Sequence, residues 1–330
     1  MKRSLRLFLV FILVASCSTL GGTALRDLPV DAEYPIVIRH IIDPRLPSLS
    51  EAEFQDMLDR CKGYIYEYLG YRVSFFVQGN QGIQAFREET KSLDDLPMMR
   101  ELKKSLLDID NESDRDRLAK YIDDLVSSAP ETTLRRHITG FERYKSREEI
   151  SDRIYRQYVE KLKKIQSIKT ADGTMLAAAP HDVALTYPFW DMALRHLEGA
   201  HFIFTNTIMA DMEVDIPIYV ALRYGITTGL VEENIHNAYR AAGVIFTYPF
   251  LSRDGFFVSE RGEEIPERLV TDVIALYATH EFGHFLNHYR DYYDHDNCIM
   301  VPAHDLDYYR WYRNKKEKKC ELEHEKLRRF

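Results

Sequence analysis

Residues 280–300 read HEFGHFLNHYRDYYDHDNCIM and begin with the pattern H-E-x-x-H. On a helix, His280 and His284 lie one turn apart, so both imidazoles project from one face and can bind the same ion. Glu281 follows His280 directly and is placed to accept a proton from water rather than to bind the metal. The pattern therefore predicts a helix that carries two metal ligands and a base.

The position of a third ligand depends on where this helix ends. His288 lies about 12 Å along the axis from His280 at 1.5 Å per residue, so one straight helix cannot bring both to an ion together with His284. Asn287 tolerates the left-handed conformation that ends helices. A break there lets the chain fold back, and it leaves Asp291, His288 and His295 as candidates for the third ligand.

The same stretch resembles the metzincin zinc peptidases, whose pattern is H-E-x-x-H-x-x-G-x-x-H/D followed by a Met-turn. Asn287 stands where that pattern has glycine, and Arg290, which cannot bind zinc, occupies the usual ligand position. Asp291 follows immediately. Residues 291–294 (DYYD) are similar to the run after the helix in secreted bacterial metalloproteases of the snapalysin and immune-inhibitor-A types, which use aspartate as third ligand.

The resemblance implies a Zn²⁺ site formed by His280, His284 and Asp291, with Glu281 as the catalytic base. It also implies that Met300 belongs to the Met-turn and forms an apolar floor beneath the metal. The expected activity is that of a zinc-dependent endopeptidase acting on a protein or peptide substrate. Such a substrate is expected to pair with an edge strand, either residues 216–222 or residues 225–231.

The rest of the sequence predicts an α/β (α+β) fold with a mixed sheet. Residues 35–43 and 71–77 have the composition of strands and enclose a helical pattern that runs from Ser50 to Gly70. Further strands are predicted in the region before the active-site helix, and Pro266 is predicted to open that helix. These later strands are residues 201–206, 216–222, 225–231 and 242–250. If all of them join the first two, one sheet precedes the helix.

The domain organisation follows from a change in composition. Residues 81–197 are rich in charge and in helical spacing, and we interpret them as a helical insertion. The peptidase domain, metzincin-like by resemblance, is then discontinuous and comprises residues 30–80 and 198–312. Residues 313–330 are predicted to form a charged C-terminal helix.

The N-terminus has the pattern of an export signal. Basic residues precede a short apolar run over residues 7–15, which is too short to span a bilayer. The end of the run, V-A-S-C, resembles the bacterial lipobox, which implies a signal peptide over residues 1–17 and lipidation of Cys17. We therefore expect an exported protein that is lipid-anchored to the bacterial cell envelope and associated with a membrane through that anchor.

The bulk composition sets limits on other functions. The chain has 330 residues, a formal net charge of −8 and no basic face that would indicate nucleic-acid binding. With Cys17 lipidated, three cysteines remain, and Cys298 with Cys320 is the pair we expect if a disulfide forms.

Two alternatives remain open at this level. In a gluzincin arrangement the third ligand would be a glutamate from a later helix, and Glu317, Glu321 and Glu325 have the spacing. The neighbouring lysines, Lys315 among them, instead indicate a solvated helix face. The second alternative is a non-catalytic surface lipoprotein, an adhesin or envelope-binding protein, with a structural zinc site.

Overall fold

The structure is a computed structural model of residues 1–330. It describes residues 33–97, 100, 108, 110–138, 140–167, 189–190, 193–194, 200–213, 219–223, 225–228, 242–287, 289, 291, 297–303 and 306–317. The predicted signal peptide and Cys17 lie outside these residues. None of the described helices is long and apolar enough to cross a membrane.

The chain divides into two compact units. The first comprises the chain up to Lys91, Trp190–Thr207 and the chain from Tyr224 onward. The second comprises Ser92–Phe189 and Ile208–Arg223. The second unit thus begins later than the insertion predicted at residues 81–197, and it also takes in a strand pair that follows it in sequence.

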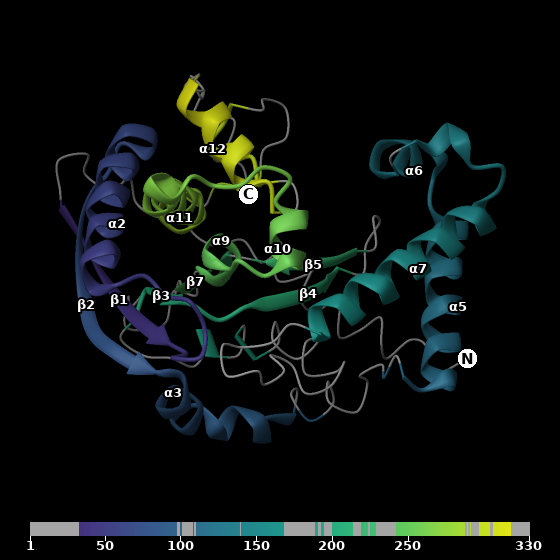
Figure 1. Ribbon diagram of the computed structural model, residues 1–330, viewed down its shortest axis with the longest axis horizontal. Coiled ribbons are helices and arrows are strands. Elements are labelled where there is room, and N and C mark those ends of the chain that lie inside the picture. The colour runs from purple at the N-terminus through teal and green to yellow at the C-terminus, as the bar shows by residue number, and fades with distance from the viewer. Residues whose placement is uncertain are drawn as a thin grey trace, which may run out of the picture. The chain divides into compact units, whose positions relative to one another are not determined.

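A five-stranded sheet in the order β2-β1-β3-β7-β6 forms the centre of the first unit (Figure 1). Four of its strands are parallel: β1 (Glu33–Ile42), β2 (Arg72–Gly82), β3 (Phe202–Thr205) and β7 (Ala242–Phe246). The fifth, β6 (Gly225–Thr228), runs antiparallel to β7 and forms one edge. The predicted mixed α/β fold is confirmed.

The helix between β1 and β2 begins and ends at the predicted residues. In α2 (Glu51–Tyr64) the Ser50 hydroxyl accepts a hydrogen bond from the Glu53 N–H, and the Glu53 carboxylate accepts one from the Ser50 N–H, a capping box. The helix continues as a π-helical turn over Ile65–Leu69. It stops at Gly70, whose φ of 79° lies in the left-handed region that glycine adopts readily.

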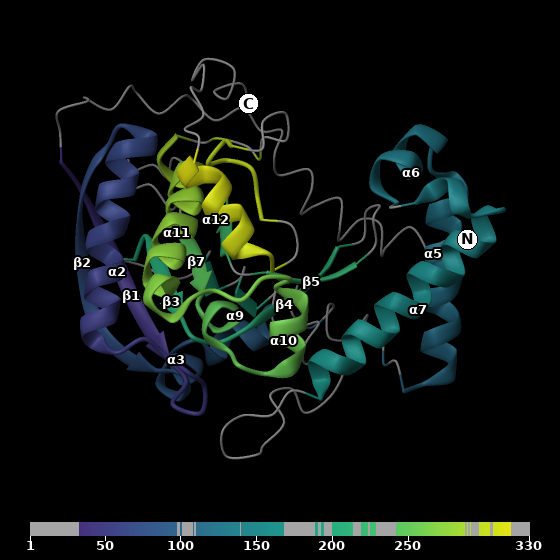
Figure 2. The ribbon, with the colours of Figure 1, turned by 45° about the horizontal axis from the view of Figure 1, so that its top comes forward.

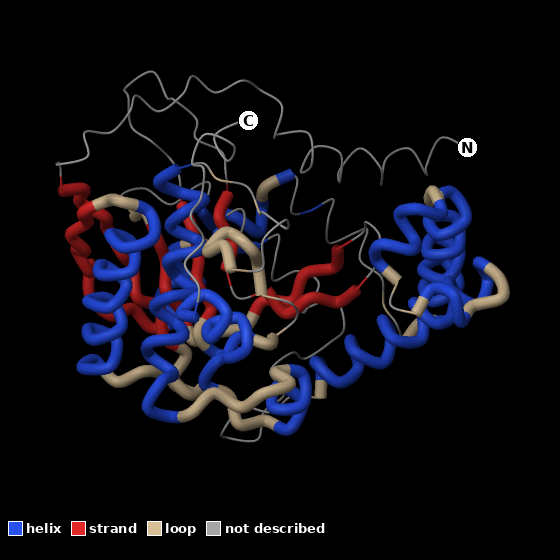
Figure 3. The backbone as a smooth tube through the Cα atoms, turned by 90° about the horizontal axis from the view of Figure 1, so that it is seen from above, coloured by secondary structure: helices blue, strands red, loops and turns tan. Residues whose placement is uncertain are grey.

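The helix that carries the H-E-x-x-H pattern is α11 (Val270–Asn287), and it packs beside α2 (Figures 1 and 2). Phe282 anchors α11 to the sheet, since its ring centre lies 4.1 Å from that of Phe202 and 5.5 Å from that of Phe75. Figure 3 shows the helices of this unit lying beside the strands. Every residue from Val273 to Gly283 is buried, so α11 is held rigidly, as a ligand-bearing helix requires.

Shorter helices complete the first unit. They are α3 (Ile83–Glu89), α9 (Tyr248–Leu251), α10 (Gly255–Glu260) and α12 (Tyr308–Glu317), with a 3₁₀ turn at Glu267–Leu269 before α11. The strand predicted over residues 242–250 therefore ends earlier, because Pro249 falls in the first turn of α9, where proline fits a helix. On α12, Lys315 is 1% exposed and its ammonium lies 5.3 Å above the Trp311 ring, so the solvated face predicted there is wrong at this residue.

The second unit contains helices and one separate strand pair. Its elements are a 3₁₀ turn at Lys91–Asp95 where the chain enters, α5 (Glu112–Ser128), α6 (Glu131–His137), a 3₁₀ turn at Phe141–Arg143, α7 (Arg147–Gln166), β4 (Met209–Glu213) and β5 (Tyr219–Arg223). Buried apolar residues at helical spacing, such as Ile122 and Ile154, pack α5 against α7. Arg147 donates to the carbonyls of Val126, Ser127 and Ala129 and so caps α5.

The strand pair corrects the single-sheet prediction. Strands β4 and β5 pair antiparallel with each other in a sheet of their own, so β5, which contains the described part of the edge predicted at residues 216–222, is not an edge of the five-stranded sheet. The alternation of residues predicts a strand there but carries no information about its partner. Of the two predicted substrate edges, the one that belongs to the five-stranded sheet is β6.

Candidate metal centre

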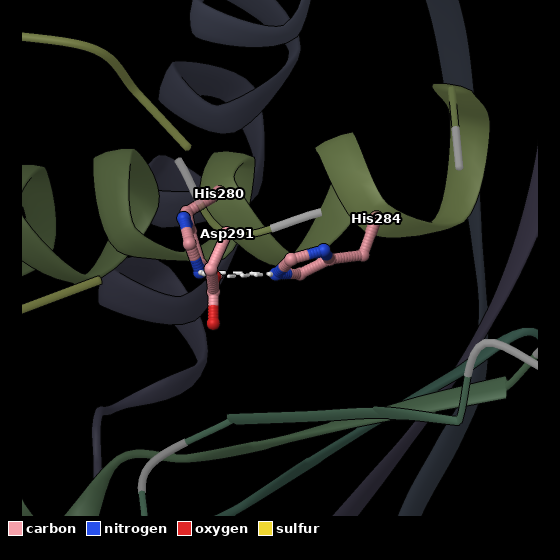
Figure 4. Close-up of side chains that lie close together, drawn as sticks. All are labelled: His280, His284 and Asp291. Atoms are coloured by element: carbon pink, nitrogen blue, oxygen red, sulfur yellow. Dashed lines mark hydrogen bonds and ion pairs between the residues drawn. The ribbon is translucent and has the colours of Figure 1, made fainter. Parts of the chain in front are cut away.

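Three side chains meet at the C-terminal half of α11 (Figure 4). The Nε2 atoms of His280 and His284 lie 3.2 Å apart. The Oδ1 atom of Asp291 lies 3.5 Å from the first and 3.3 Å from the second. The three atoms thus form a nearly equilateral triangle whose members can all bind one ion.

The chain after α11 folds back as predicted. The helix ends at Asn287, and the N–H of Tyr289 donates to the carbonyl of Gly283 at 3.4 Å. This reversal brings Asp291 to the face that carries the two histidines. His288, Arg290 and His295 lie outside the described residues.

Backbone carbonyls fix the tautomer of both histidines. The Nδ1 of His280 lies 2.8 Å from the carbonyl oxygen of Ile299, and the Nδ1 of His284 lies 2.5 Å from that of Tyr289. A carbonyl accepts only, so each Nδ1 carries a proton and each ring turns its Nε2 toward the centre. This is the outer-shell arrangement that metal-binding histidines use.

The donor set fits a tetrahedral ion. Zinc binds nitrogen and carboxylate oxygen at about 2.0–2.2 Å, which places neighbouring ligands of a tetrahedron about 3.3–3.6 Å apart. The separations of 3.2, 3.3 and 3.5 Å agree with that spacing. Without a cation, two lone pairs and a carboxylate would face one another at these distances, which is unfavourable.

The three side chains differ in their exposure to solvent. The side chain of His280 is 3% exposed and that of His284 19%, whereas that of Asp291 is 40% exposed. Asp291 is thus the most exposed of the three, and His280 the most deeply buried.

The pKa values of the two histidines are shifted from the ordinary value in opposite directions. Burial lowers the pKa of His280, and the neighbouring His284 lowers it further. Burial also acts to lower the pKa of His284, but the hydrogen bond to Asp291 and the charge of Glu281 outweigh it and raise that pKa to about 9. A positive charge at this position, whether a proton or a metal ion, is thus stabilised by the two carboxylates.

A tight turn lies behind the centre. The N–H of Val301 donates to the carbonyl of Cys298 at 3.1 Å, and the same turn presents the Ile299 carbonyl to His280. Trp311 on α12 donates its Nε1–H to the carbonyl of Val301 at 2.6 Å. The turn is therefore fixed from two sides, which fixes the carbonyl that orients His280.

Met300 lies in this turn and packs against α11. Its side chain is fully buried, and a Cβ built on Gly283 would overlap its Sδ atom. Gly283 stands between the two histidines in sequence, and only glycine leaves room for this approach. Cys320 lies outside the described residues, so the pairing of Cys298 with Cys320 stays a prediction.

Glu281 is 3% exposed, and its Oε1 accepts a hydrogen bond of 3.0 Å from the hydroxyl of Tyr277. Sequence reasoning missed this contact, although tyrosine and glutamate four residues apart on a helix are neighbours. It also missed the contacts of Tyr289 and Ile299 with the histidines, for which the sequence carries no signal, because both act through backbone carbonyls. In the gluzincin alternative, Glu317 ends α12, and Glu321 and Glu325 lie outside the described residues.

Comparison of the chain with protein-family models, with curated proteins and with solved structures gives no match.

Proposed function

We propose that this chain is a zinc-dependent endopeptidase of metzincin-like type. The observation that carries the proposal is the triangle formed by His280, His284 and Asp291, with Glu281 buried beside it. Two imidazoles and one carboxylate suit zinc, and three protein ligands leave a position for water or substrate, as in catalytic rather than structural zinc sites.

A zinc ion in this triangle would supply Lewis acidity, polarising the scissile carbonyl and making water a better nucleophile. The three ligands hold their positions through the contacts of α11, the turn at residues 298–301 and the chain reversal after Asn287. Glu281 accepts the proton of the attacking water and returns it to the leaving amine, so it acts first as general base and then as general acid.

The substrate is proposed to bind along β6. This strand pairs with β7 and forms an edge of the five-stranded sheet, and it lies next to α11. An extended peptide can add to such an edge through main-chain hydrogen bonds, which places a peptide bond near the helix with little demand on side-chain identity.

Export and lipid anchoring complete the proposal. They rest on the basic start, the apolar run and the V-A-S-C sequence at the N-terminus. The enzyme would then act on proteins at the bacterial cell envelope.

The test is the Glu281→Gln variant of the full-length chain, assayed with an internally quenched fluorescent peptide library. Glutamine keeps the size of the side chain but cannot act as a base. We expect one equivalent of zinc in both proteins and a loss of hydrolysis of at least about 100-fold in the variant. Hydrolysis that survives in Glu281→Gln would contradict the proposal. Full zinc content with no hydrolysis by the wild type would favour the non-catalytic surface lipoprotein.

A further inference from the structure

The carboxylate proposed as the base is held by a second side chain on the same helix. Tyr277 precedes Glu281 by four residues, and its hydroxyl donates to Glu281 Oε1 at 3.0 Å. Both side chains are 3% exposed. A hydrogen bond to a carboxylate in such a buried place is stronger than one in water and restricts how the carboxylate can rotate.

The Tyr277 ring is itself fixed by its surroundings. Its centre lies 5.8 Å from those of Phe250 and Tyr308 and 5.5 Å from that of Trp311. Phe250 and Tyr308 stack on each other at 4.0 Å. The hydroxyl therefore reaches Glu281 from an aromatic cluster that allows the ring little movement.

The same cluster connects the base to the metal ligands. The ring of His280 lies 5.6 Å from that of Tyr277, and Trp311 also holds the turn whose Ile299 carbonyl bonds to His280. The same aromatic cluster therefore fixes the positions of both Glu281 and His280. An exposed tyrosine at the same spacing would provide no comparable alignment.

From this geometry we infer that Tyr277 is a positioning residue for Glu281. Its hydrogen bond holds one carboxylate oxygen in place, so the carboxylate of Glu281 keeps the single orientation in which the other oxygen can accept the proton of the attacking water. The inference rests on the proposed peptidase function. It concerns a hydroxyl outside the H-E-x-x-H pattern and does not involve metal binding by Tyr277.

The test compares Tyr277→Phe with Tyr308→Phe in the full-length, zinc-loaded chain. Each variant removes one hydroxyl from the same aromatic cluster and keeps the ring. For a peptide selected from the quenched library, we expect kcat to fall by about 10- to 100-fold in Tyr277→Phe, a loss of the size expected when the hydrogen-bond partner that orients a site residue is removed. KM and zinc content should stay within about twofold of the wild type, and Tyr308→Phe should retain kcat.

A double-mutant cycle separates positioning from general damage. If Tyr277 acts through Glu281, Tyr277→Phe should have no further effect on the residual rate of Glu281→Gln. An equal loss in both backgrounds would overturn the inference, as would an unchanged kcat or a loss of zinc in Tyr277→Phe.

Infrared difference spectroscopy supplies a readout that does not depend on turnover. The spectrum of the wild type minus that of Glu281→Gln isolates the carboxylate stretches of Glu281. These bands should lie at other frequencies when the same subtraction is made between Tyr277→Phe and the double variant Tyr277→Phe/Glu281→Gln. Unshifted bands would overturn the contact. If the wild type hydrolyses no peptide, the proposed function fails and the positioning role fails with it, whereas shifted bands would still show the contact itself.

Discussion

Helix α11 carries two buried polar clusters, and they are built in opposite ways. In its first turn, Asp272 is an acceptor surrounded by donors: the hydroxyls of Tyr64 and Tyr312 lie at 2.6 and 2.5 Å, and Arg60 lies at 3.2 Å. About two turns later, His280 meets two further acceptors, His284 and Asp291, and the Nδ1 protons of both rings are directed away to backbone carbonyls.

The difference teaches how to separate a structural cluster from a candidate centre. The Asp272 cluster satisfies its own charge, and it joins α2, α11 and α12. The histidine cluster has no such set of donors at its centre, and a proton or a metal ion bound there would be stabilised by the neighbouring carboxylates. Burial alone does not distinguish the two, because both contain side chains that are less than a tenth exposed. The balance of donors and acceptors does.

The largest effect is expected when Asp291, the carboxylate of the histidine cluster, is removed. Asp291→Ala takes away one of three ligands and should weaken zinc affinity by more than about 100-fold, beyond the cost of losing an outer-shell partner. Zinc content after dialysis against a weak chelator measures this. Glu263→Ala, which removes an exposed carboxylate paired with Arg313, is the control and should keep its zinc.

Zinc that survives Asp291→Ala would contradict the role of Asp291. It would favour His288 or His295, the other candidates that the sequence offers.

The next effect concerns the structural cluster. Asp272→Ala leaves two buried hydroxyls and Arg60 without their shared acceptor and should lower the free energy of unfolding by about 2–4 kcal/mol. Both tryptophans, Trp190 and Trp311, belong to the first unit, so urea unfolding followed by tryptophan fluorescence reports on it. Asp59→Ala, an exposed acid on α2, should cost under about 0.5 kcal/mol.

Zinc content sharpens the comparison between the clusters. Folded Asp272→Ala should still bind one equivalent of zinc, because its cluster only holds the helices together. Loss of zinc from the folded variant would mean that the two clusters are not independent.

The contrast also shows how far the sequence predicts the site. The spacing of His280 and His284 predicts their common face, and the turn-compatible Asn287 predicts the end of the helix. Both deductions use side-chain identity, whereas the choice of Asp291 among three candidates rested on the resemblance to a family. The carbonyls of Ile299 and Tyr289 carry no such signal, since any residue supplies a carbonyl. Tyr277 is an intermediate case, because its spacing to Glu281 is visible in the sequence but its burial is not.

For the fold, too, the sequence predicts the local elements but not which elements lie beside one another. The helix from Ser50 to Gly70 is bounded by a capping box and a left-handed glycine, which are local signals. The assignment of β5 to a separate strand pair depends on which backbone lies beside it, and strand composition does not encode that. The burial of Lys315 likewise depends on the ring of Trp311 below it rather than on its charged neighbours.

The smallest expected effect is a difference in pH dependence. In chain stripped of metal, the pKa of His284 is raised to about 9 by Asp291 and Glu281, against the effect of burial. A raised pKa stabilises the fold fully below the unfolded value of about 6.5, and this contribution is lost as the pH rises through 9. The pKa of Asp272 is shifted the other way: burial would raise it, but bonds from Tyr312, Tyr64 and Arg60 lower it. Its contribution is lost only in acid, below about pH 4.

Stripped wild type should therefore lose about 1–3 kcal/mol of stability between pH 6.5 and 9 relative to stripped His284→Gln. Urea unfolding at several pH values in this window measures the difference, and the comparison cancels every group that titrates equally in both proteins. Zinc-loaded wild type should not show the loss, because zinc replaces the proton and binds more tightly as the pH rises. Parallel curves for the two stripped proteins would show that His284 is not held charged by its carboxylate neighbours.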